Sequence, residues 1–76
     1  MATYNGHKNW NHWNVALWIN NDAGLYEEAR RLVQHSRTKA VAAREFVAAM
    51  RANGTPCTPD YAPYTVSSVR AALRGI

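Results

Sequence analysis

The 76 residues suffice for one domain, and a chain this short buries only about 60% of its unfolded surface. Its composition, 47% hydrophobic and 18% charged, excludes a disordered protein. A single cysteine, Cys57, excludes an internal disulfide, and no run reaches the ~18 apolar residues of a membrane helix. We therefore expect a cytoplasmic protein that makes no membrane contact.

A polar lead-in over residues 1–9 precedes residues 10–22, which hold all three tryptophans and the longest apolar run. This run fits a strand by alternation, and it also fits a helix that is buried nearly all round. We favour a helix over residues 12–20, because no second strand is evident elsewhere in the chain. Asn11 is the expected N-cap of this helix.

Asparagines interrupt and end this stretch. Asn14 lies inside the apolar run, where its amide must find partners. It would either bond the backbone across the helix turn or face a ligand. Residues 20–22 then end the helix, and Asp22 is a strong N-cap for the next one.

Two amphipathic helices are predicted to follow. The apolar stripe of the first consists of Leu25, Tyr26, Ala29, Leu32 and Val33. After a break over residues 34–37, a third helix capped by Ser36 or Thr38 runs to about Asn53. Its apolar stripe consists of Ala43, Phe46, Val47 and Met50.

Three prolines between residues 55 and 63 predict a loop in largely extended conformation. A last short helix begins at Thr65 or Ser67. The sequence thus predicts an all-α protein, a compact bundle of about four short helices in a single domain over residues 1–76.

The tryptophans have two interpretations. They could stack unpaired bases beside a basic surface, or they could form the core of a chain with few other large side chains. We favour the core. The expected core residues are Trp10, Trp13, Leu17, Trp18, Leu25, Tyr26, Leu32, Phe46, Met50, Val69 and Leu73.

No motif for catalysis or metal binding is evident. His7, His12 and His35 with Cys57 match no zinc spacing, and no nucleophile has a base implied beside it. We therefore expect no catalytic residue, no metal site and no cofactor, and we expect that the protein is not an enzyme.

Charge is distributed unevenly along the chain. Residues 29–53 contain six bases and one acid, whereas residues 22–28 contain three acids and no base. Either set could contact a partner, although a solvated helix face is the alternative. The candidate partner-binding residues are Arg30, Arg31, Arg37, Lys39, Arg44 and Arg51 among the bases, and Asp22, Glu27 and Glu28 among the acids.

Residues 9–26 resemble a motif of small, largely uncharacterised proteins of tailed bacteriophages. The motif reads Asn-Trp-x-Thr-Trp-Asn-Val-Ala-Leu-Trp-Ile, one variable residue, Asn-Asp, two variable residues and Leu-Tyr. His12 stands where the motif has threonine. The resemblance implies a phage or prophage source. Small phage accessory proteins often bind and block a host machine, including CRISPR and restriction complexes.

Three functional hypotheses follow. The first is a phage accessory protein that binds and inhibits a host protein or nucleoprotein complex. The second is direct nucleic-acid binding through the basic residues between Arg30 and Arg51. The third is a structural or assembly protein that forms homo-oligomers through the apolar face of the last helix, which consists of Val66, Val69, Leu73 and Ile76.

Overall fold

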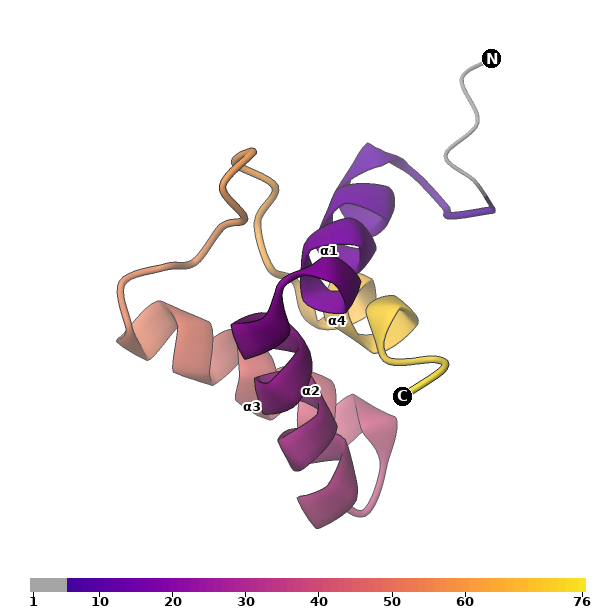
Figure 1. Cartoon of the computed structure of the whole chain (residues 1–76), viewed down its shortest axis with the longest axis vertical. Helices are drawn as coiled ribbons and strands as arrows, with labels where there is room; N and C mark the ends of the chain where they lie inside the picture. Colours follow the sequence, from indigo (N-terminus) through magenta and orange to yellow (C-terminus); the bar gives the residue numbers. More distant parts are fainter. Residues whose placement is uncertain (1–5) are drawn as a thin grey trace.

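The computed structural model describes residues 6–76, and over this range it contains four helices and no strand. They are α1 (Trp10–Asn21), α2 (Ala23–His35), α3 (Lys39–Ala52) and α4 (Val66–Ala72) (Figure 1). The predicted all-α bundle is therefore confirmed. Residues 1–5 of the predicted lead-in lie outside the described residues.

Short polar side chains fix the helix starts, as the sequence predicts for α2, α3 and α4. The carboxylate of Asp22 accepts a hydrogen bond from the Leu25 amide at 2.9 Å, and the Thr38 hydroxyl accepts one from the Val41 amide at 3.1 Å. In α4, Thr65 and Ser68 form a reciprocal capping box.

The first helix begins earlier than predicted. Asn9, not Asn11, is its N-cap, and the Asn9 side chain accepts a hydrogen bond from the His12 amide at 3.0 Å. The Asn11 amide instead donates to the Pro63 carbonyl at 2.8 Å. An asparagine can cap a helix only from the half-extended position, and Asn11 already lies inside the first turn.

The helices form a closed ring in which α1 packs on α2, α2 on α3, α3 on α4, and α4 on α1. Phe46 is fully buried inside this ring and meets Tyr64 edge-to-face at 5.4 Å. Alanines on α2, α3 and α4 are buried too, which lets the helices approach closely. The predicted core residues Leu32, Phe46, Met50, Val69 and Leu73 are all buried.

The expected core role of the tryptophans is wrong for Trp10, which is 40% exposed, and the same applies to Leu17 (39%) and Tyr26 (37%). Trp13, Trp18 and Leu25 are only half-buried. The fully buried residues of the apolar run are instead Val15 and Ile19. Trp10 is the first residue of α1, and Trp18 donates its indole N–H to the exposed Asp60 carboxylate, so neither ring is enclosed by the core.

Residues 56–64 form a closed hairpin instead of the extended loop that the prolines predict. The Tyr61 amide donates to the Thr58 carbonyl at 2.8 Å, and the Thr58 amide donates to the Ala62 carbonyl at 2.8 Å. Cys57 and Pro63 form an isolated antiparallel bridge. This is a three-residue turn whose last position, Tyr61, is left-handed with φ 69°.

A polar network fastens the hairpin to α1. The Asp60 carboxylate accepts hydrogen bonds from the Asn14 amide and from the Trp18 indole, both at 2.9 Å. The Thr58 hydroxyl donates to the Asn14 side-chain oxygen at 2.6 Å. The side chain of Asn14 therefore bonds the hairpin and not the backbone of its own helix, and its buried amide is satisfied there.

We predict that Asn14→Ala lowers the free energy of unfolding by about 2–3 kcal/mol, because two hydrogen bonds to the hairpin are lost in a buried site. Urea denaturation followed by circular dichroism measures this loss. Asn20→Ala is the matched control: Asn20 is exposed and donates only to the Ala16 carbonyl of its own helix, so its loss should stay within about 0.5 kcal/mol. Equal losses in the two variants would contradict the importance of the network.

We predict that Tyr61→Gly raises the free energy of unfolding by about 0.5–1 kcal/mol. A left-handed tyrosine carries a steric cost that glycine avoids, and the side chain is 84% exposed, so little packing is lost. Tyr61→Ala is the control, since it removes the ring but keeps the Cβ, and its stability should not rise. A less stable glycine variant in thermal unfolding would show that the ring stabilises the fold.

Candidate anion-binding groove

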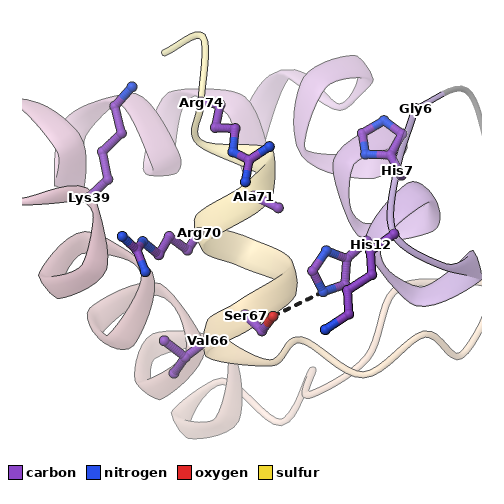
Figure 2. Close-up of a pocket in the computed structure, with 10 residues that line it drawn as sticks. Gly6, His7, His12, Lys39, Val66, Ser67, Arg70, Ala71 and Arg74 are labelled. Carbon is purple, nitrogen blue, oxygen red and sulfur yellow. Dashed lines mark hydrogen bonds between the residues drawn. The ribbon is translucent and has the colours of Figure 1, made fainter.

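An open groove of about 1050 Å³ lies where α4 meets the start of α1, the start of α3 and the segment before α1. In Figure 2, α4 runs through the middle, with Lys39 on one side and His7 and His12 on the other. We call it the basic groove, and it is lined by Gly6, His7, Lys8, His12, Lys39, Val66, Ser67, Arg70, Ala71 and Arg74.

Four permanent cations line the basic groove without any carboxylate. Lys8, Lys39, Arg70 and Arg74 are all exposed, and two of them lie four residues apart on one side of α4 and its C-terminal turn. Over residues 6–76 the sole ion pair is between Arg31 and Glu28, so these four charges are not neutralised within that range. Like charges gathered in a concave surface create a positive potential that attracts anions.

His12 closes the groove beside α4. Its Nε2 atom lies 3.0 Å from the Ser67 hydroxyl, and its side chain is buried. Burial lowers the pKa of His12 from its usual value, and the nearby Lys8, His7 and Arg74 lower it further. The ring is therefore neutral at pH 7, and the tautomer protonated on Nδ1 can accept a hydrogen bond from Ser67.

The pair of Ser67 and His12 has the spacing of a nucleophile and its base. In that chemistry a third group orients the imidazole through its second nitrogen. Among residues 6–76, no hydrogen bond holds the Nδ1 atom of His12. The contact as it stands joins α4 to α1, and the prediction that the protein is not an enzyme stays a prediction.

The structure separates most of the predicted partner-binding residues from this groove. Of the six predicted bases only Lys39 lines it, whereas the other five are exposed elsewhere on α2, on α3 and in the turn between them. Among the predicted acids, Asp22 caps α2, Glu28 pairs with Arg31, and Glu27 is exposed. Partner binding by these residues stays a prediction.

Sequence analysis missed the groove residues His7, Lys8, His12, Ser67, Arg70 and Arg74 as a group. One signal was present: Arg70 and Arg74 are four residues apart and share one side of a helix. Their meeting with Lys39 and with the segment before α1 depends on how α4 packs, which no local pattern reveals.

The described part of the chain offers no cluster of three or more side chains that could hold a metal ion. Likewise, none of the four helices is long and apolar enough to cross a membrane. Cys57 is a half-buried free thiol in the hairpin. The basic groove is thus the feature of residues 6–76 that best suits binding.

The family of unknown function DUF7249 matches residues 1–72. The chain belongs to this family. The comparison with curated proteins and the comparison with solved structures gave no match. Membership in DUF7249 relates nearly the whole chain to this family but assigns it no activity. Any inference about function therefore depends on the basic groove.

We predict that the free energy of unfolding falls as the pH drops below about 6.5, because the folded protein binds the His12 proton less tightly than the unfolded chain does. Above that pH, His12 is neutral in both the folded and the unfolded chain, so its contribution to the free energy of unfolding no longer changes with pH. Urea denaturation at pH values between 5 and 8 measures the slope, and His12→Gln should reduce it. His35→Gln, at an exposed histidine, is the control for loss of a histidine. An unchanged slope in His12→Gln would contradict the prediction.

Proposed function

We propose that this DUF7249 protein is a non-enzymatic accessory protein that binds a nucleoprotein complex and contacts its nucleic acid through the basic groove. One observation carries the proposal: Lys8, Lys39, Arg70 and Arg74 face the groove without a carboxylate among its lining residues. Such a concentration of unpaired cations matches the phosphate backbone. The net charge of +4 adds a long-range attraction of the same sign.

The resemblance of residues 9–26 to tailed-phage proteins supports a finer version of this proposal. On that version the protein is made by a phage or prophage, acts in the host cytoplasm and inhibits a host complex, such as a CRISPR or restriction complex. These systems hold nucleic acid that a basic groove could contact. In this version the basic groove makes the contact for which the sequence suggested the face from Arg30 to Arg51 or the acids between Asp22 and Glu28.

Two of the four residues that motivated the oligomer hypothesis, Val69 and Leu73, are fully buried inside the chain. Val66 is 40% exposed and Ile76 is half-buried, so only part of that face is open to a second copy. Homo-oligomerisation through other surfaces stays a prediction without a specific contact.

We predict that reversing two groove charges, Arg70→Glu with Arg74→Glu, weakens binding to a labelled oligonucleotide at least tenfold at ~50 mM salt. For the unchanged protein, the logarithm of affinity should fall linearly with the logarithm of salt concentration, with a slope of about −0.7 to −0.9 per phosphate contact. Fluorescence anisotropy measures both quantities.

The matched control is Arg37→Glu with Arg44→Glu, which changes net charge equally but lies outside the groove. It should weaken binding much less. Equal weakening by both pairs would mean that overall charge, and not the groove, governs binding. No binding to any oligonucleotide at ~50 mM salt would overturn the proposed function.

A further inference from the structure

A second, smaller hollow adjoins the basic groove along α1. It measures about 250 Å³ and is lined by His7, Trp13, Ala16, Leu17 and Asn20. We call it the α1 depression. His7 lines both hollows, so the two surfaces meet at this residue. His12 in the groove and Ala16 in the depression are four residues apart on one side of the helix, which makes the connection continuous.

We propose that the joined surface binds an unpaired stretch of a single-stranded nucleic acid, with phosphates in the basic groove and a base against the α1 depression. The inference rests on the proposed function and names the form of nucleic acid that the groove takes. A single strand is the expected ligand because a base inside a duplex has both faces covered by its neighbours, whereas an unpaired base can lie on an apolar side chain.

The chemistry of the depression suits a base. Trp13 and Leu17, four residues apart on α1, supply an aromatic and an aliphatic surface, and Leu17 is 39% exposed. Asn20 adds a polar edge: its amide nitrogen donates to the Ala16 carbonyl at 2.8 Å, which leaves its side-chain oxygen as an acceptor for an exocyclic amine.

Charge also favours this occupant over an acidic protein surface. Neither hollow has a carboxylate among its lining residues, and the cations gather in one hollow while the apolar side chains gather in the other. A nucleotide carries the same division, since its phosphate is charged and its base has an apolar face. An acidic protein surface would be complementary to the groove alone.

The test compares a labelled single-stranded 12-mer with a duplex of the same sequence by fluorescence anisotropy at ~50 mM salt. The single strand should bind at least tenfold more tightly. Leu17→Ala should weaken single-strand binding about fivefold, because it removes the aliphatic surface against which the base lies, and it should leave duplex binding unchanged. Inorganic tripolyphosphate lacks a base, so it should displace the single strand equally well from the unchanged protein and from Leu17→Ala.

Tyr26→Ala is the matched control, because Tyr26 is a similarly exposed apolar residue (37%) on α2 outside both hollows. It should change neither affinity, and circular dichroism should confirm that both variants fold. Equal affinity for strand and duplex, or equal effects of Leu17→Ala and Tyr26→Ala, overturns the single-strand inference but leaves the groove as a phosphate-binding site. Absence of binding to either form overturns the proposed function as well.

Discussion

The buried amide of Asn14 is the constraint on which the rest of the structure depends. An amide in this position must be satisfied, and its partners are Thr58 and Asp60 of the hairpin. The same carboxylate accepts from Trp18, so one acidic group holds two side chains of α1. These hydrogen bonds also lower the pKa of Asp60, so the anion that accepts them persists to lower pH.

The docked hairpin determines where the following chain goes. It ends at Tyr64, whose ring meets Phe46 in the core, and the next residue, Thr65, caps α4. The last helix consequently packs on both α1 and α3. This position brings Arg70 and Arg74 to the basic groove, so the groove depends on a polar network on another part of α1.

The helices could be predicted because their signals are local. Apolar periodicity and short polar caps such as Asp22 and Thr38 need only a few neighbouring residues. The burial of individual side chains of α1 could not be predicted, since periodicity identifies apolar side chains but not which of them the neighbouring helices cover. Val15 and Ile19 are fully buried, whereas Trp10 is 40% exposed. Similarly, the partner of Asn14 lies 46 residues away and is set by tertiary packing.

The candidate site was harder to predict than the fold for the same reason. Counting charge along the chain favours the stretch from Arg30 to Arg51, because its bases are close in sequence. The basic groove instead gathers cations from before α1, from the start of α3 and from α4. Only Lys39 belongs both to the predicted bases and to the basic groove. Counting charges along the sequence cannot identify a surface whose residues come together only in the folded chain.

The long separation between Asn14 and Asp60 also governs the order in which the chain can acquire its structure. During synthesis α1 leaves the ribosome first, and its partners in the hairpin follow 44 and 46 residues later. Until then the tryptophan-rich helix has neither its polar anchor nor the last helix to cover it, and a short helix alone is marginally stable. Closing such a distant contact costs chain entropy before it yields any stabilisation. The domain should therefore fold cooperatively only once its last third is made, and until then the side of α1 that packs on α4 is uncovered.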